Sequence, residues 1–267
     1  MNNFEQLCEN FIINRERFQY LEEISKLLLT DPERAQDIWC YGTMPLVLLD
    51  EVVKSYLVFD YKEIPEEEYN KAVMVLNVLQ TLVEDRLVRR EFIFTDFPIF
   101  ILPFLNSRKF TRELESSRLA ALGVIGTLVK DGDVDIINYL KDTDIVPLTL
   151  KTMDSGSEIS KAISGYIFLK ILQTRDGLES LTARFEKFML ICDVINSMIT
   201  NAIKKSSKRI LTPALQCLRK ILDIKQVKRA LKSEIPPFLK DLQIKELLRN
   251  DANMLSVYDE IIDILNN

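Results

Sequence analysis

The chain has 267 residues, of which 47% are hydrophobic and 28% are charged, with a formal net charge of −5. This is ordinary globular composition, which excludes a disordered or membrane protein, and 7 glycines with 9 prolines argue against an all-β fold rich in tight turns. The sequence contains no histidine, so the commonest general base and zinc ligand are missing. We therefore expect no catalytic residues, no metal site and no cofactor.

The four cysteines lie far apart in apolar helical contexts, which predicts buried thiols in a reducing compartment. The N-terminus lacks the basic start and apolar core of a signal peptide. The most apolar window, Phe97 to Leu105, is too short to span a bilayer. We expect a cytoplasmic protein without a membrane segment, and the nucleus is left open as a second compartment.

A proline begins or interrupts an apolar run at regular places along the chain. The runs recur about every 50 residues and are Met44–Leu49, Phe97–Leu102, Val146–Leu150 and Ile235–Leu239, with Phe188–Cys192 as a member that lacks the proline. Proline suits the first turn of a helix, where its missing N–H has no intrahelical partner. Each run therefore predicts the start of a helix.

A long amphipathic segment and a short one precede each of these runs. A unit of long helix, short helix and proline-started helix at roughly 40 to 50 residues is typical of armadillo or HEAT repeats. Because one repeat cannot bury its own apolar face, such units must stack. The sequence predicts an all-α, right-handed superhelical solenoid of five to six armadillo- or HEAT-like repeats, forming a single domain over residues 1–267.

The stretch Leu119–Leu172 is the centre of this predicted stack. Its first helix is apolar on nearly every side, so it needs neighbours on both sides, and Gly123 and Gly126 predict a closely packed helix backbone. The sequence Ser-Gly-Ser-Glu at 155–158 has the spacing of a capping box, which predicts a helix from Ser157 to Leu172. The acidic segment Tyr61–Tyr69, which contains a proline, is predicted to be a loop.

Two blocks in this centre, Ser117–Lys130 and Met153–Lys161, resemble the signature of the Rcd-type cell-differentiation family. That family is the Caf-forty type armadillo-repeat subunit of the Ccr–Not messenger-RNA deadenylase complex. Shorter matches follow in the family's order, at Tyr41–Thr43, Pro103–Leu105, Asp176–Leu178 and Phe185–Phe188. The resemblance therefore covers nearly the whole chain.

The resemblance implies a non-catalytic adaptor. Family members bind the Not-one scaffold subunit and receive short linear peptides of RNA-binding, repressor and GW-repeat silencing proteins. The expected result is directed messenger-RNA decay and translational repression. The resemblance also leaves a homodimer open, because the family can self-associate.

By resemblance, a peptide helix docks in a groove near Ser116, Arg118, Leu119 and Ile163. The exposed edge around Ser116 and Arg118 is then expected to face a partner. Ser116 stands where the family usually has an aromatic residue, which leaves the identity of the peptide open. The alternative is that Leu119 and Ile163 belong to the core between repeats.

A second site implied by the resemblance is a pair of shallow tryptophan pockets, with Phe185, Lys187, Gln226 and Lys228 as candidates. Phenylalanine, lysine and glutamine replace the family's usual tyrosine and arginines at the first three positions. Because lysine stacks on aromatic rings less well than arginine, we expect a weakened or lost pocket. The alternative is that Phe185 and Phe188 are core residues.

The scaffold-binding surface implied by the resemblance includes Trp39, Tyr41, Val52 and Val53. Trp39 is the only tryptophan of the chain, and tryptophan and tyrosine are favoured interface anchors. Packing of Trp39 in the core is the alternative.

The segment 203–232 holds ten basic residues and one acidic residue. Such a basic stripe can hold phosphate backbones without reading their sequence, so Lys204, Lys205, Lys208 and Arg209 are nucleic-acid candidates. A solvated helix face is the alternative, and the absence of interleaved aromatic residues gives no support for base stacking.

Overall fold

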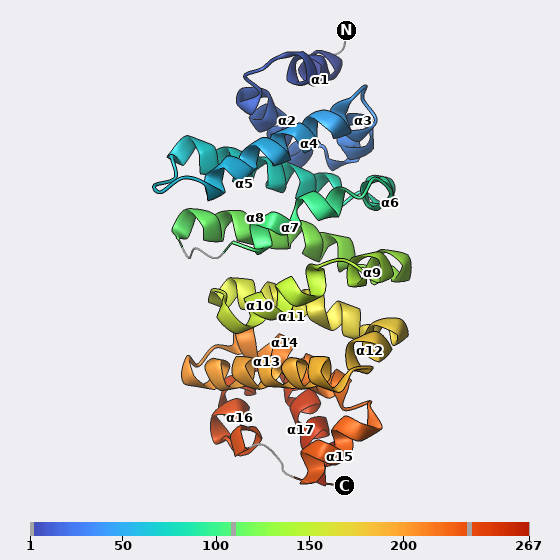
Figure 1. The fold of residues 1–267 in the computed structure, drawn as a ribbon, viewed down its shortest axis with the longest axis vertical. Helices are drawn as coiled ribbons and strands as arrows, with labels where there is room; N and C mark the ends of the chain where they lie inside the picture. The colour runs from blue at the N-terminus through green and yellow to red at the C-terminus, as the bar shows by residue number, and fades with distance from the viewer. Residues whose placement is uncertain (1–2, 108–110, 234–236, 267) are drawn as a thin grey trace. The chain divides into compact units, whose positions relative to one another are not determined.

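The computed structural model describes residues 3–107, 111–233 and 237–266, and every regular element within them is helical. The chain divides into two compact units, residues 1–136 and 137–267. Figure 1 shows the helices of both units, and each unit is described by itself. A single domain over residues 1–267 stays a prediction. Within the described ranges, none of the helices has both the length and the apolar character that crossing a membrane requires.

The first unit contains eight α-helices and three short 3-10 helices among its described residues. The α-helices are α1 (Asn3–Ile13), α2 (Phe18–Thr30), α3 (Ala35–Trp39), α4 (Met44–Lys54), α5 (Glu66–Leu82), α6 (Arg86–Phe94), α7 (Leu102–Leu105) and α8 (Arg112–Val129). The 3-10 helices are η1 (Pro32–Arg34), η2 (Ser55–Phe59) and η3 (Phe97–Phe100). Helix α9 (Val134–Lys141) contains the boundary between the units.

The second unit continues the same alternation of long and short helices. Its α-helices are α10 (Ile145–Ser155), α11 (Glu158–Gln173), α12 (Arg175–Thr182), α13 (Phe185–Lys204), α14 (Lys208–Ile221), α15 (Lys225–Ser233), α16 (Leu242–Leu248) and α17 (Ala252–Asn266). The described part of this unit also includes one 3-10 helix, η4 (Pro237–Lys240).

The long helices of each unit pack against one another in chain order. In the first unit α5 packs between α2 and α8, and in the second unit α14 packs between α11 and α17. Each of α2, α5, α8 and α11 is followed by a short helix and then by a helix that overlaps a predicted run, namely α4, η3, α10 and α13. The run predicted after α14, Ile235–Leu239, lies partly outside the described residues. This confirms the predicted order of elements within a repeat.

Prolines and acidic residues mark helix starts, with one difference from the prediction. Pro45 lies in the first turn of α4, and Pro147 is the third residue of α10. The predicted loop Tyr61–Tyr69 is too long, because α5 already begins at Glu66. Its first turn holds three glutamates, and the positive end of the helix dipole favours carboxylates there.

Gly123 of α8 does not mark the closest helix approach. A Cβ atom at Gly123 would meet the side-chain amide of Gln80 on α5, at 2.3 Å from Oε1, and not a helix backbone. The tight approach lies in the second unit, where a Cβ atom at Gly165 of α11 would be only 3.0 Å from Cβ of Pro213 on α14. The lack of a side chain at Gly165 therefore allows α11 and α14 to pack closely.

The cysteines are all free thiols, and the expectation that all four are buried is wrong for Cys40, which is exposed, and holds only in part for Cys192, which is half-buried. Cys8 and Cys217 are buried, whereas Cys40 is exposed at the end of α3. Burial raises the pKa of Cys8 to about 11 and that of Cys192 to about 12. These two thiols are therefore protonated and unreactive near neutral pH.

Helix α11 begins where the sequence predicts, but its cap is Ser157 and not Ser155 of the predicted capping box. The hydroxyl of Ser157 accepts a hydrogen bond from the backbone N–H of Ser160 at 3.2 Å, whereas Ser155 is the last residue of α10. We expect Ser157→Ala to lower the free energy of unfolding by about 1 kcal/mol, because that N–H loses its partner. The matched control is Ser155→Ala, whose exposed hydroxyl only donates back to the carbonyl of Lys151. Urea unfolding midpoints would contradict the assignment if both variants shifted equally.

Candidate functional site

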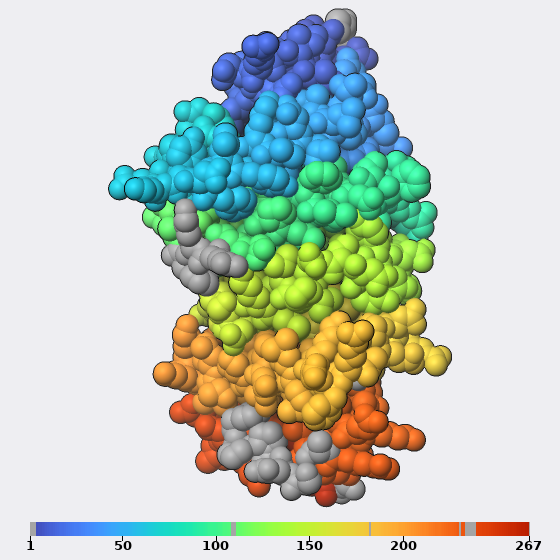
Figure 2. Space-filling model, in the orientation of Figure 1, coloured from blue at the N-terminus to red at the C-terminus, as the bar shows by residue number. Residues whose placement is uncertain are grey.

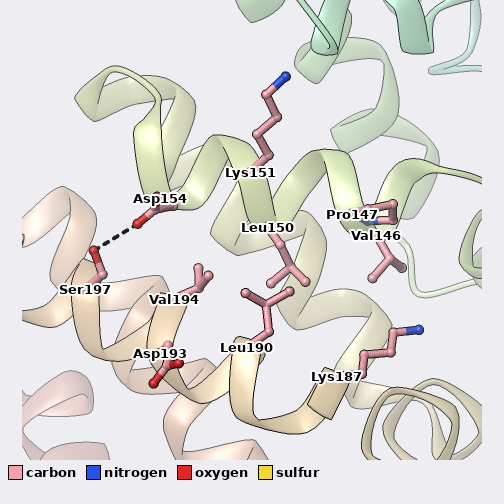
Figure 3. Close-up of a pocket in the computed structure, with 10 residues that line it drawn as sticks. All are labelled: Val146, Pro147, Leu150, Lys151, Asp154, Lys187, Leu190, Asp193, Val194 and Ser197. Atoms are coloured by element: carbon pink, nitrogen blue, oxygen red, sulfur yellow. Dashed lines mark hydrogen bonds between the residues drawn. The ribbon is translucent and has the colours of Figure 1, made fainter. Parts of the chain in front are cut away.

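An open groove lies between α10 and α13 in the second unit, with a volume of about 780 Å³ (Figure 3). The lining residues from α10 are Val146, Pro147, Leu150, Lys151 and Asp154, and those from α13 are Lys187, Leu190, Asp193, Val194 and Ser197.

The middle of the groove is apolar. Leu150 and Val194 are buried in its floor, while Leu190 is an exposed leucine between them. Figure 3 shows the side chains of Leu150 and Leu190 pointing toward each other across the groove. Covering apolar surface is favourable by about 25 cal/mol per Å², so this middle section suits a large apolar side chain of a ligand.

One end of the groove is held in place by hydrogen bonds to α10. The buried ammonium of Lys161 on α11 donates to the carbonyl oxygens of Met153, at 3.0 Å, and Asp154. The hydroxyl of Ser197 on α13 donates to Asp154 Oδ1 at 3.1 Å. Burial lowers the pKa of the Lys161 ammonium from its ordinary value. The last turn of α10 is thus fixed to both neighbouring helices.

Only one of the four tryptophan-pocket candidates lines this groove. Lys187 lies in the first turn of α13 and belongs to the lining, whereas Phe185, Gln226 and Lys228 do not. The core alternative is wrong for Phe185, whose side chain is 75% exposed. Gln226 is exposed and Lys228 half-buried, both on α15.

The predicted peptide-groove residues fall on α8 of the first unit and α11 of the second. Ser116, Leu119 and Ile163 are half-buried, so part of each side chain remains accessible. The expectation that Arg118 lies on an exposed edge is wrong, because its side chain is only 2% exposed. Its guanidinium donates to the carbonyl oxygen of Ser107, at 3.2 Å, and pairs with Glu115.

The scaffold candidates near the N-terminus separate into core and surface. Trp39 is 4% exposed, and its ring packs on Phe92 and Phe97, each with a centroid distance of 5.8 Å, as the core alternative states. Val52 is fully buried, while Val53 is 43% exposed. Tyr41 is half-buried against the ring of Phe4.

An exposed apolar stripe runs along α4 beside Val53, and the sequence prediction misses most of it. Leu46 is 65% exposed, Leu57 in η2 is 51% exposed, and Leu49 between them is half-buried. These residues recur at helical spacing along α4 and η2, which belong to the part of the first unit coloured blue in Figure 2. The spacing of residues 46, 49, 53 and 57 could have predicted this stripe from the sequence. Residues 44–49 are apolar on every side of the helix, however, so the spacing does not stand out there.

The nucleic-acid candidates surround the turn between α13 and α14. All four residues are exposed, and Lys208 also forms an ion pair with Asp251 on the segment before α17, at 2.9 Å. Four cations at one turn give a basic patch, of which Lys204, Lys205 and Arg209 lie outside that ion pair. No group of three or more cysteine, aspartate or glutamate side chains within the described ranges is placed to hold a metal ion.

A sequence model of the cell differentiation family, Rcd1-like, matches residues 7–265. The chain is 30% identical over 238 residues to the cell differentiation protein rcd1 of Schizosaccharomyces pombe, covering 89% of this chain and 84% of that protein. It is 29% identical over 266 residues to protein CAF40 of Saccharomyces cerevisiae, covering 99% and 71% respectively.

Two solved structures share the fold. One is an engineered protein with a TM-score of 0.67 and 9% identity, covering 100% of this chain and 99% of that chain. The other is a computationally designed armadillo repeat protein for modular peptide recognition, with a TM-score of 0.64 and 14% identity, covering 98% and 99%. This likeness confirms the predicted helical solenoid of the armadillo type.

We expect Arg118→Met to lower the free energy of unfolding by about 2 kcal/mol, because it leaves the half-buried carboxylate of Glu115 and the carbonyl of Ser107 without their cation. Arg112→Met, at an exposed position of the same helix, is the control and should change stability by less than about 0.5 kcal/mol. Thermal and urea unfolding measure both. If the two variants were equally stable, the buried structural role of Arg118 would be wrong.

Proposed function

This chain belongs to the Rcd1-like cell differentiation family, and we propose that it is a non-catalytic adaptor subunit of the Ccr–Not messenger-RNA deadenylase complex. In this proposal it binds the Not-one scaffold subunit on one surface and short peptides of RNA-binding or repressor proteins on another. The bound peptide brings the deadenylase to a chosen message, for decay and translational repression, in the cytoplasm and in the nucleus.

The observation that carries the peptide-binding part is the apolar groove between α10 and α13. It combines an exposed leucine, Leu190, with a fixed wall, because Lys161 and Ser197 both hold the last turn of α10. An open groove with a preorganised wall binds a segment without first having to order itself. Lys187 at its edge is the residue that family resemblance assigns to a tryptophan pocket.

The stripe on α4 supports the scaffold-binding part of the proposal. Leu46, Val53 and Leu57 expose apolar side chains in a line on the first unit, which is the arrangement that an amphipathic partner helix covers. Asp50 and Lys54 lie beside this stripe on the same helix and form an ion pair with each other at 2.7 Å. The stripe therefore has a charged border, as interface cores commonly do.

A second function, nucleic-acid binding, is favoured by the crowding of cations in the second unit. Lys204, Lys205 and Arg209 are exposed within one turn of chain. On α15 the pKa of Lys232 is lowered by desolvation and by the neighbouring positive charge of Lys228. Like charges held this close favour an anionic ligand that relieves their repulsion.

The scaffold surface is tested by the double variant Leu46→Asp and Val53→Asp. We expect at least a tenfold loss of co-purification with the Not-one scaffold, because two charges enter an apolar contact. Leu29→Asp is the control, since Leu29 is an equally exposed leucine on α2 of the same unit. Circular dichroism should show full helicity for both variants. Undiminished scaffold recovery with the double variant would disprove this surface.

The nucleic-acid alternative is tested by changing Lys204, Lys205 and Arg209 to glutamate together. We expect weaker binding to a single-stranded RNA and a salt dependence whose log–log slope falls by about 2, since three phosphate contacts are lost. A control with Arg15, Lys26 and Lys62 changed to glutamate makes the same charge change on exposed residues of the first unit. An identical slope in both variants would rule out this basic turn as the binding site.

A further inference from the structure

The groove between α10 and α13 carries opposite charges at its two ends. We propose that it selects a peptide with a divided charge pattern, in which an acidic residue lies at the Lys187 end, a basic residue lies at the Asp154 and Asp193 end, and a large apolar side chain fills the middle. This inference rests on the proposed peptide-binding function and specifies the ligand of that site.

The charge order follows from how the two helices run. The first turns of α10 and α13 lie at the same end of the groove, where Val146, Pro147 and Lys187 meet (Figure 3). At the other end, Asp154 in the last turn of α10 lies next to Ser197 of α13, with Asp193 on the same side. A single basic end and a single acidic end result.

These charges are available to a ligand. Of the ion pairs in the described chain, none uses Lys187 or Asp193, and both residues are exposed. Asp154 has its Oδ1 atom held by Ser197, and the nearby buried ammonium of Lys161 offsets part of the charge of its carboxylate, so Asp193 carries most of the negative charge that this end offers a ligand. Lys151 also lines the groove, but its ammonium points away from α13 in Figure 3, so it belongs to neither end.

Helix ends reinforce the same polarity. The first turns of α10 and α13 both contribute partial positive charge beside Lys187, since each helix has its amino end there. The carboxyl end of α10 adds little negative charge beside Asp154, because the Lys161 ammonium already donates hydrogen bonds to the carbonyl oxygens of Met153 and Asp154. A ligand with one acid and one base therefore meets complementary fields at both ends, and complementarity of this kind gives specificity more than raw affinity.

The spacing of the two ends sets the spacing of the ligand charges. Lys187 and Asp193 are six residues apart on α13, which is about 9 Å along the helix axis. An extended peptide covers about 3.3 Å per residue, so its acid and base should be three residues apart with the apolar anchor between them. The sequence GSEWLKSG meets this requirement when its chain runs from the Lys187 end of the groove to the Asp193 end.

The experiment compares four synthetic peptides with the full-length chain by fluorescence anisotropy or calorimetry at low salt. The peptides are GSEWLKSG, the neutral GSQWLQSG, the doubly acidic GSEWLESG and the doubly basic GSKWLKSG. We expect GSEWLKSG to bind at least about threefold more tightly than either like-charged peptide, because each exposed pair contributes up to about fivefold. The difference should shrink at 0.5 M salt.

Two variants locate the effect. Lys187→Glu makes both ends acidic, so the preference should change from GSEWLKSG to GSKWLKSG. Lys240→Glu makes the same charge change at an exposed position of η4 outside the lining and should leave the original order. If Lys240→Glu changes the order as much as Lys187→Glu does, local charge is not the cause and the inference is overturned.

The neutral peptide separates the two levels of the proposal. If GSQWLQSG binds, loses affinity in Leu190→Asp, and the other three peptides bind equally well, then the peptide groove stands and the charge selection is overturned. If none of the four peptides binds, both the groove function and the charge selection fail.

Discussion

Buried cations that reach back to the end of the preceding helix hold this structure together. The clearest case is Arg89, whose guanidinium donates to the carbonyl oxygens of Val83, at 2.9 Å, and Glu84, at 3.1 Å, just past the end of α5. Lys161 does the same for the end of α10, and Arg118 for the carbonyl of Ser107. The last carbonyls of a helix have no intrahelical partner, so each sharp turn between packed helices requires a donor. A cation also suits the negative end of the helix dipole.

This constraint decides which surfaces are left for partners. The buried ammonium of Lys161 donates a hydrogen bond to a carbonyl oxygen in the last turn of α10. That turn therefore stays helical beside α13. The groove wall is then set by helices alone, which keep their geometry better than loops do. Arg118, a cation that the sequence analysis assigned to ligand binding, has this internal role, so recognition in the groove falls to its apolar middle and to the charges outside the core.

The repeat order, the start of the helix after Ser157 and the helical class follow from the sequence because local rules fix them. Whether a given side chain faces solvent does not follow in the same way. Residues 44–49 read as one apolar run, so nothing local separates buried Val52 from exposed Val53 just beyond it. Arginine is almost never buried without a partner, and Arg118 has two: Glu115 on its own helix and the carbonyl of Ser107 on another segment. Tertiary partners of this kind leave no mark in the pattern of residues.

The two parts of α13 that border the ends of the groove, its first turn and the turn at Ser197, differ in how firmly they are held. Its first residue, Phe185, follows Arg184, which supplies no side-chain cap, so the leading N–H groups of the helix rely on solvent. One groove length away, Ser197 is tied to Asp154. Local opening in a protein begins where backbone groups are least protected. Amide hydrogens in the first turn of α13 should therefore exchange with solvent faster than those around Ser197, and a bound segment would slow the fast set most. The groove would then have one rigid end, around Ser197 and Asp154, and one end, at the first turn of α13, that becomes ordered when a ligand binds.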